Sequence, residues 1–201
     1  MRRRYDLALQ EIHEELIKMG SLCEQSIELA CSLLYKNDND SFEEVENLEK
    51  QINKKERHIE NLCMRSITLQ QPVAGDLKQI SIALKMITDL ERIGDQALDI
   101  ASLPPFPSFS MEIHLDDMCA MCGLMLKRAI DAFIQNDIHM AQEVIASDDI
   151  VDGLFVKVKD EATKLIQNNP ELASDILNLL MAAKYLERIA DHSVNLAECV
   201  A

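Results

Sequence analysis

The apolar residues between positions 74 and 101 fall on one side of a helix. With ~100° of rotation per residue, one arc holds Ile80, Leu84, Ile87, Gly94 and Leu98. Positions 170–201 repeat the pattern with Ile176, Leu180, Ala183, Ala190 and Val194. Positions 138–167 show it again with Val144, Val151, Phe155, Ala162 and Ile166. One apolar arc on an otherwise polar helix is typical of a helix that packs against others.

Short polar or proline-containing breaks divide the chain into six predicted helices. We expect Ser41 to cap the second helix and Pro170 to lie in the first turn of the sixth. The segment SLPPFPSFS, residues 102–110, holds three of the five prolines and is the clearest linker. The same order of helices and breaks occurs on both sides of it. The sequence therefore predicts an all-α protein of two tandem three-helix bundles, at residues 1–101 and 111–201.

Composition supports the helices and narrows the function. Five Gly, five Pro and 4% aromatic residues are fewer than a β-rich chain of 201 residues needs. The formal net charge of −15 argues against nucleic acid as a ligand, because backbone phosphates require a surplus of Lys and Arg. The charge is compatible with cations or with a basic surface on a protein partner. The alternative is that the surplus acidic residues only keep a helical bundle soluble.

The sequence predicts a cytoplasmic protein with reduced thiols. Asp6 and Glu11 interrupt the apolar run of a signal peptide, and no uncharged run approaches the ~18 residues that span a membrane. The six cysteines lack the spacing of small secreted proteins. Cys119 and Cys122 form a CxxC pair without the βαβ context of a redox motif or the further ligands of a zinc site. We interpret both as buried apolar residues.

One sequence motif occurs twice, as LERIGDQALDIA and as LERIADHSVNLA, and its acidic residues are candidate metal ligands. Each copy keeps a Glu and an Asp four residues apart. On a helical wheel Glu91 falls in the middle of the apolar arc. Asp95 lies to one side of Glu91, and Asp99 lies further to the same side. Glu187 and Asp191 take the same places in the second copy. Glu and Asp at this spacing lie about 5–6 Å apart at Cβ, so both can ligate one ion.

A buried carboxylate requires a proton, a cationic partner or a metal. The fifth predicted helix places Asp148 and Asp152 on its apolar side, four residues apart. Together with Glu187 and Asp191 they would form an all-oxygen site from two helices. Such a site suits Mg, Mn, Ca or iron, and the oxygen ligands do not exclude zinc.

The first half offers a weaker ligand set. Glu49 stands in the position equivalent to Asp148, but Asn53 stands where the second half has Asp152, and an amide brings no charge. We therefore expect the second half to bind metal more tightly. Asp89 projects away from Glu91 and is not included, and His192 is expected to be a surface histidine.

Ion pairs are the alternative to metal. Glu91 and Glu187 could pair with Arg92, with Arg188, or with lysines on a neighbouring helix, as buried salt bridges and nothing more. The spacing alone leaves both readings open. The recurrence of the acidic pair in both halves favours metal.

Three stretches resemble the PhoU family of phosphate-signalling regulators. They are RRRYDLALQEIHEELIKMGSLCEQSIELA, QQPVAGDLKQISIALKMITDLERIGDQALDIA and LERIADHSVNLA. The resemblance implies two tandem three-helix bundles over nearly the whole chain, with multinuclear iron, zinc or other metals bound on the second and third helix of each. The implied ligands are Glu91, Asp95, Asp99, Asp148, Asp152, Glu187 and Asp191. Asn53 replaces an expected acid of the first site, and Asn195 stands where the first half has Asp99. The first site is therefore expected to be empty or to hold fewer ions.

The resemblance implies regulation by protein contact and no catalysis. Family members restrain phosphate uptake and repress phosphate-starvation signalling, so the expected partners are the ATPase of a phosphate ABC transporter and a sensor histidine kinase. We expect a cytoplasmic adaptor that reaches the inner face of the membrane through its partners, without inserting into it; a homodimer is one option. The alternatives are a carboxylate-bridged metal enzyme and a structural scaffold without metal. None of the five histidines follows a Glu by three residues, which counts against a ferritin-like di-iron enzyme.

Overall fold

The computed structural model describes residues 2–70, 74–106 and 114–201. These residues form six long α-helices and one short 3₁₀ turn, and they contain no strand. The elements are α1 (Arg2–Leu33), α2 (Asn39–Gln70), α3 (Ala74–Ala101), α4 (Leu115–Gln135), α5 (Ile138–Asn168), η2 (Pro170–Leu172) and α6 (Ala173–Glu198). The all-α prediction is confirmed. None of these helices is long and apolar enough to cross a membrane.

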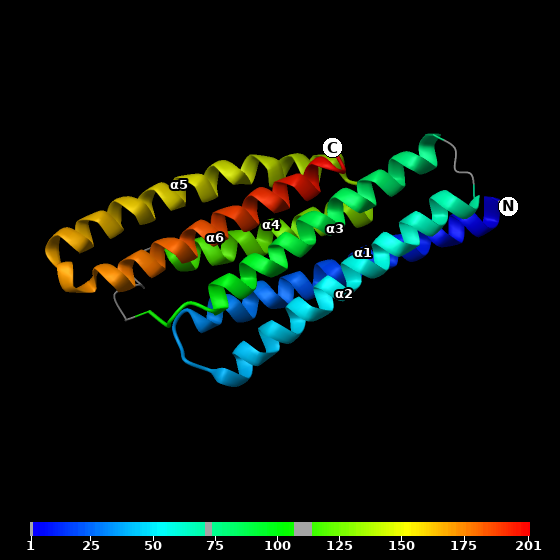
Figure 1. Cartoon of the computed structure of the whole chain (residues 1–201). Helices are drawn as coiled ribbons and strands as arrows, with labels where there is room; N and C mark the ends of the chain where they lie inside the picture. Colours follow the sequence, from blue (N-terminus) through cyan, green and yellow to red (C-terminus); the bar gives the residue numbers. More distant parts are fainter. Residues whose placement is uncertain (1, 71–73, 107–113) are drawn as a thin grey trace.

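The helices form two three-helix bundles that lie side by side (Figure 1). In the first repeat α1, α2 and α3 pack against one another, and in the second α4, α5 and α6 do the same. The repeats meet where α3 packs against α6 and α1 packs against α4. Helices α3 and α6, which contain the repeated acidic motif, therefore lie at the centre of the molecule, and each contacts three other α-helices.

The predicted linker is described only as far as Phe106. The side chain of Phe106 is buried, and its backbone N–H donates a hydrogen bond to the carbonyl of Leu34 at 2.7 Å. This contact ties the first half of the segment to the end of α1. Residues 107–113 lie outside the described residues, so the boundaries of the two repeats within 102–110 stay a prediction.

Two predicted helix starts are wrong in detail. Helix α2 begins before Ser41, because Asp38 is the capping residue: its carboxylate accepts hydrogen bonds from the backbone N–H and the hydroxyl of Ser41. Pro170 begins the 3₁₀ turn η2, and α6 follows from Ala173. The bounds of α3 agree with the prediction at both ends.

The buried face of α3 is wider than the predicted arc and turned to one side of it. Besides the polar Asp89 and Gln96 it consists of Ile80, Ala83, Met86, Ile87, Leu90, Ile93, Gly94, Ala97, Ile100 and Ala101. Glu91 lies at the edge of this face, with 22% of its side chain exposed, so its predicted place in the middle is wrong. The reason is that α3 contacts α1, α2 and α6 at once, which a wheel for a single buried arc does not include.

Candidate metal-binding site

Four carboxylates of α5 and α6 lie near one another in the second repeat. They are Asp148 and Asp152, one turn apart on α5, and Glu187 and Asp191, one turn apart on α6. We call these four residues the second acidic group. Burial and the charges of Asp191, Asp152, Asp149 and Glu187 together raise the pKa of Asp148 to about 6. The acids of the two helices therefore face each other, and their role as metal ligands stays a prediction.

The second acidic group is open to solvent on one side. Asp152 and Asp191 are exposed, whereas Asp148 and Glu187 are half-buried. Partial burial and the charge of Glu187 raise the pKa of Asp191, and the nearby Lys184 partly offsets this effect. An ion from solution can therefore reach the carboxylates without an opening of the bundle.

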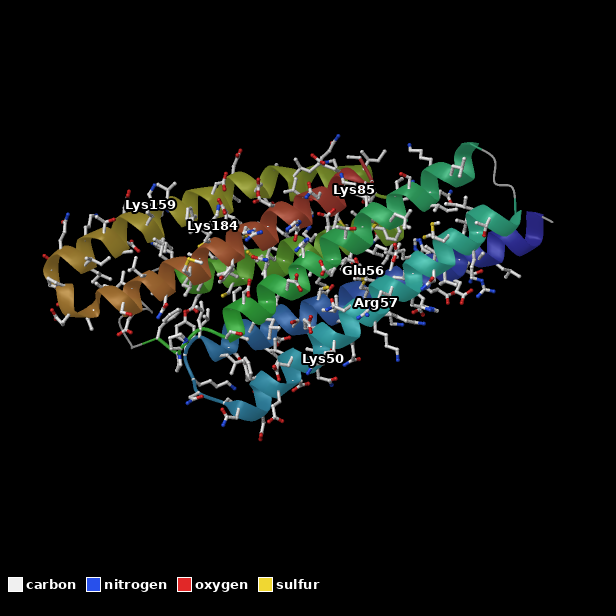
Figure 2. All side chains as sticks on the ribbon, viewed as in Figure 1. Lys50, Glu56, Arg57, Lys85, Lys159 and Lys184 are labelled. Carbon is white, nitrogen blue, oxygen red and sulfur yellow. The ribbon has the colours of Figure 1, made fainter. Side chains whose placement is uncertain are left out.

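Lys184 is the cation closest to this group. Its ammonium pairs with Glu187, three residues further along α6, and lies 5.4 Å from the ring centre of Phe155 on α5. Figure 2 labels Lys184 on α6. The lysine side chain is 48% exposed, so it can move into solvent. The predicted alternative of an ion pair is thus present for Glu187, and the pairing residue comes from the same helix. One lysine offsets only part of the charge of four carboxylates.

A first acidic group occupies the equivalent place in the first repeat. It consists of Glu49 and Glu56 on α2 and of Glu91 and Asp95 on α3. Burial raises the pKa of Glu91, and the charges of Asp95, Glu56 and Glu49 add to this increase. Burial, the charge of Glu60 and a smaller effect of Asp95 raise the pKa of Glu56.

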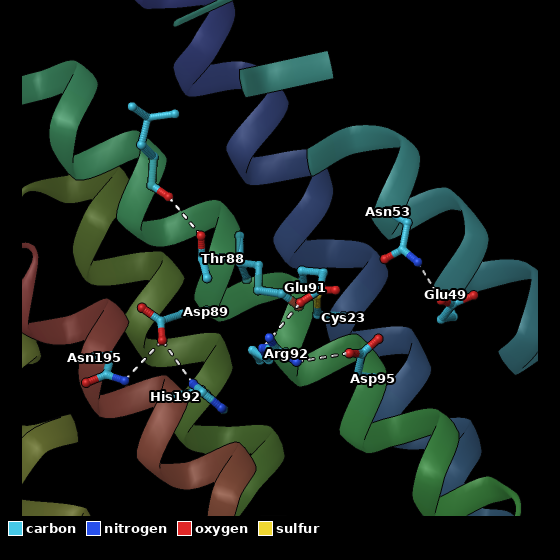
Figure 3. A network of polar contacts seen from close by, with 12 residues as sticks. Cys23, Glu49, Asn53, Thr88, Asp89, Glu91, Arg92, Asp95, His192 and Asn195 are labelled. Atoms are coloured by element: carbon cyan, nitrogen blue, oxygen red, sulfur yellow. Dashed lines mark hydrogen bonds and ion pairs between the residues drawn. The ribbon is translucent and has the colours of Figure 1, made fainter. Parts of the chain in front are cut away.

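Arg92 and Asn53 reduce the negative charge that the first acidic group presents. The Arg92 guanidinium lies 3.6 Å from Glu91 and 3.7 Å from Asp95 (Figure 3). Asn53 stands where the second group has Asp152, and its amide donates a hydrogen bond to Glu49. The predicted ion pair between Glu91 and Arg92 is therefore present, and the weaker binding of metal by the first half stays a prediction.

Asp99 lies near Asp95 of the first acidic group, and its role as a metal ligand stays a prediction. Asp99 is largely exposed on α3. Partial burial and the charge of Asp95 raise its pKa, and the charge of Arg188 on α6 partly offsets this increase. Its closest cationic neighbour thus comes from the second repeat. This residue lies at the contact between α3 and α6, at the margin of the predicted site.

Asp89 was excluded from the sequence-based site, yet it forms the main polar contact between the repeats. Its carboxylate accepts hydrogen bonds from Nδ1 of His192 at 2.9 Å and from the amide of Asn195 at 3.0 Å (Figure 3). Only 10% of the Asp89 side chain and 20% of the His192 side chain are exposed. The expectation of a surface histidine is wrong, because position 192 faces α3.

Among the described residues, no three His, Cys, Asp or Glu side chains are arranged as a set that could hold a metal ion as it stands. The assignment of either acidic group as a metal site stays a prediction. The donors are all carboxylate oxygens, which suit hard divalent and trivalent cations.

The repeated arrangement has counterparts in known proteins. The family model described as the PhoU domain matches residues 16–103 and again residues 115–200. The chain belongs to the PhoU family. It is 33% identical over 204 residues to the phosphate-specific transport system accessory protein PhoU homolog of Clostridium acetobutylicum, covering 98% of this chain and 92% of the relative. It is 35% identical over 184 residues to the homolog of the same name from Aquifex aeolicus, covering 90% and 83%.

The fold is shared with a solved structure of the PhoU family. The crystal structure of PhoU from Pseudomonas aeruginosa superposes with a TM-score of 0.90 at 31% identity and covers 98% of this chain and 96% of that chain. The relatives compared here are named as accessory proteins of phosphate transport and not as enzymes. The two tandem three-helix bundles predicted from the sequence are confirmed as the fold.

Three residues near the sites were missed by sequence reasoning. Glu56 lies seven residues after Glu49, a spacing that returns to the same face of a helix, and this signal was available. Lys184 precedes Glu187 by three residues, which also predicts an ion pair on one helix. Asp89 carried no such signal, because its partners lie more than one hundred residues away in the sequence.

Proposed function

We propose that this chain is a metal-binding regulatory adaptor of phosphate transport, acting by protein contact and without catalytic turnover. The observation that carries the proposal is the second acidic group, in which like charges from two helices raise the pKa of Asp148 to about 6. Membership of the PhoU family and the names of the relatives support the link to phosphate transport.

A bound cation would relieve the repulsion within the second acidic group. Burial and the charges of Asp191, Asp152 and Glu187 raise the pKa of Asp148, and the Lys184 ammonium pairs with Glu187 as a counter-charge. Carboxylate oxygens suit magnesium, manganese and iron, and they also accept zinc. The ion would hold α5 to α6 at the exposed edge of the second repeat. Its identity and number depend on the ions that the cell supplies.

The first acidic group would bind the same ions more weakly. Arg92 already neutralises part of the charge of Glu91 and Asp95, and Asn53 contributes an amide in place of a carboxylate. Glu56 supplies one carboxylate that the second group lacks, since Phe155 occupies the corresponding position on α5. Each group thus has four carboxylates, but Arg92 pairs with two of them in the first group, whereas Lys184 pairs with Glu187 in the second. For this reason we expect two sites of unequal affinity, the tighter one in the second repeat.

The partners that fit this role are the ATPase of a phosphate ABC transporter and a sensor histidine kinase. The relatives are named accessory proteins of a phosphate-specific transport system, which supports contact with the transport machinery. The adaptor would act in the cytoplasm at the inner face of the membrane, and it would change its affinity for the ATPase with metal occupancy.

Binding to the ATPase of the phosphate transporter tests this proposal. The wild-type chain and an Asp148→Asn/Asp191→Asn variant would be titrated onto immobilised ATPase, once with manganese and once with a chelator. We expect binding by the wild type that weakens at least tenfold in chelator, and no such difference for the variant. Absence of binding by wild type under both conditions would contradict the adaptor role. Equal binding with and without manganese would contradict its control by metal.

A further inference from the structure

One exposed side of α2 carries cationic residues. They are Lys50, Lys54, Arg57 and Arg65, and we call these four residues the basic face. Their spacings of four, three and eight residues bring them to the same side of a helix. Figure 2 labels Lys50 and Arg57 on α2. Among the exposed residues between Lys50 and Arg65 the one acid is Glu60, which projects about 120° away from Lys54 around the helix.

The cations of the basic face are not used within the part of the chain that the structure describes. There, none of the four forms an ion pair, whereas Lys55, on the side of α2 that faces α1, pairs with Glu15. Nε of Arg57 donates a hydrogen bond to the carbonyl of Asn53 on its own helix, at 3.1 Å. This bond uses one of the five donors of the guanidinium group. The basic face can therefore receive an acidic partner from outside the chain.

The second repeat indicates that the fold does not require these charges. In the register that aligns the two acidic groups, the counterparts of the first three cations are Asp149, Gly153 and Val156 on α5, all of them exposed. Only Arg65 has a cationic counterpart, Lys164. An acid, a glycine and an apolar residue thus serve at the same places of an equivalent helix. Helix packing does not account for the basic face, in a chain with 35 acids and 20 bases.

We propose that the basic face is a docking surface for a helix of a partner protein that carries Asp and Glu along one side. From Lys50 to Arg65 the basic face extends over about 22 Å of α2, at 1.5 Å per residue. A helix with acids at intervals of three or four residues presents its carboxylates at a matching spacing. Arg57 suits such a partner, because a planar guanidinium binds both oxygens of a carboxylate. The proposal rests on the proposed role as an adaptor and does not depend on metal.

The net charge of the chain favours a narrow partner over a broad one. A helix with its side chains is about 10 Å wide, and charges more than about 8 Å away are largely screened at physiological salt. A partner helix on the basic face is therefore attracted by its cations. Duplex nucleic acid or an anionic membrane would extend further, over exposed acids such as Glu43 and Glu44 of α2, and would meet the net charge of −15.

Fluorescence anisotropy with a labelled model peptide tests the proposal. The probe is an alanine-rich helical peptide of about 20 residues with Glu at every third or fourth position along one side, long enough to cover the basic face. The control peptide has Gln at the same positions. In a chelator and at low salt, we expect the wild-type chain to bind the Glu peptide at least tenfold more tightly than the Gln peptide. This preference should disappear as the salt concentration rises.

Two triple variants locate the binding. Lys50→Glu/Lys54→Glu/Arg57→Glu should weaken binding of the Glu peptide at least tenfold. The matched control reverses three exposed lysines of α5, at positions 157, 159 and 164, and changes the total charge by the same amount. Binding by this control should stay within twofold of wild type. Circular dichroism checks that both variants keep the helical content of the wild-type chain.

Three results would overturn the proposal. One is equal affinity of the wild-type chain for the Glu and Gln peptides, and another is equal weakening by both triple variants. The third is tighter binding of wild type to phosphatidylserine vesicles or duplex DNA than to the Glu peptide, lost in the α2 variant, which would assign the basic face to a membrane or to nucleic acid. These titrations contain no metal and no ATPase. Their failure therefore contradicts the docking surface alone, whereas failure to bind the ATPase contradicts the proposed function.

Discussion

The Asp89 carboxylate on α3 accepts a hydrogen bond from Nδ1 of His192 on α6, at 2.9 Å. Asn195 donates to the same oxygen from one turn further along α6. One acid of the first repeat thereby satisfies two polar groups of the second, where α3 packs against α6.

Loss of the Asp89 carboxylate should destabilise the protein. In Asp89→Ala the donors of His192 and Asn195 lose a partly buried acceptor, which costs about 1–3 kcal/mol of the free energy of unfolding. Urea denaturation monitored by circular dichroism measures the change. Glu28→Ala, at an exposed acid of α1, is the control and should change stability by less than about 0.5 kcal/mol. Equal stability of Asp89→Ala and wild type would show that the contact contributes nothing.

Two glycine-to-alanine substitutions should have opposite effects. A Cβ at Gly20 on α1 would lie 2.3 Å from Cδ1 of Ile130 on α4, so Gly20→Ala should destabilise the chain by about 1–3 kcal/mol. A Cβ at Gly123 on α4 meets no atom within 4 Å. There the better helix propensity of alanine should stabilise the chain by about 1 kcal/mol.

A double variant separates this clash from other effects of the alanine. Ile130→Val removes the Cδ1 methyl that lies closest to the added Cβ. Unfolding in urea should show Gly20→Ala/Ile130→Val to be less destabilised than the sum of the two single variants. Simple additivity would mean that Gly20 is not required for the close approach of α1 and α4.

The stability of the metal-free protein should rise as the pH falls from about 7 to 5. The pKa of Asp148 is about 6 in the folded chain and near its ordinary value of 3.8 in the unfolded chain. Between these values the folded state binds the proton more readily, so the repulsion at Asp148 is fully present above about pH 6 and is relieved below it.

The variant Asp148→Asn isolates this effect. In chelator at pH 7.5 it should exceed wild type in unfolding free energy by roughly 1 kcal/mol, a value that allows for solvent screening of a partly exposed group. At pH 5.0 the difference should shrink, because wild-type Asp148 is then mostly protonated. Asp160→Asn, at an exposed acid of the same helix, should show no such pH dependence. A constant advantage of Asp148→Asn at both pH values would contradict the raised pKa.

The sequence predicts the helices and the acidic pairs because both depend on residues close together in the chain. The bounds of α3 follow from its period and its flanking breaks, and the spacing of Glu187 and Asp191 places both on one side of α6. Contacts between the repeats carry no such local signal. His192 gains its partner, Asp89, from a helix of the other repeat. The helical wheel places Glu91 in the middle of the apolar arc, but α3 contacts three other helices, and these contacts widen the buried face so that Glu91 lies at its edge.

Metal content is the measurement that tests the account most directly. The wild-type chain, Asp148→Asn/Asp191→Asn and Glu49→Gln/Glu91→Gln would be loaded in turn with manganese, iron, zinc and magnesium, desalted and analysed by elemental mass spectrometry. We expect at least one retained ion in wild type, its loss in the variant of the second acidic group, and its retention in the variant of the first. No retained ion after any loading, or equal metal in all three proteins, would contradict the claim that the second acidic group binds metal.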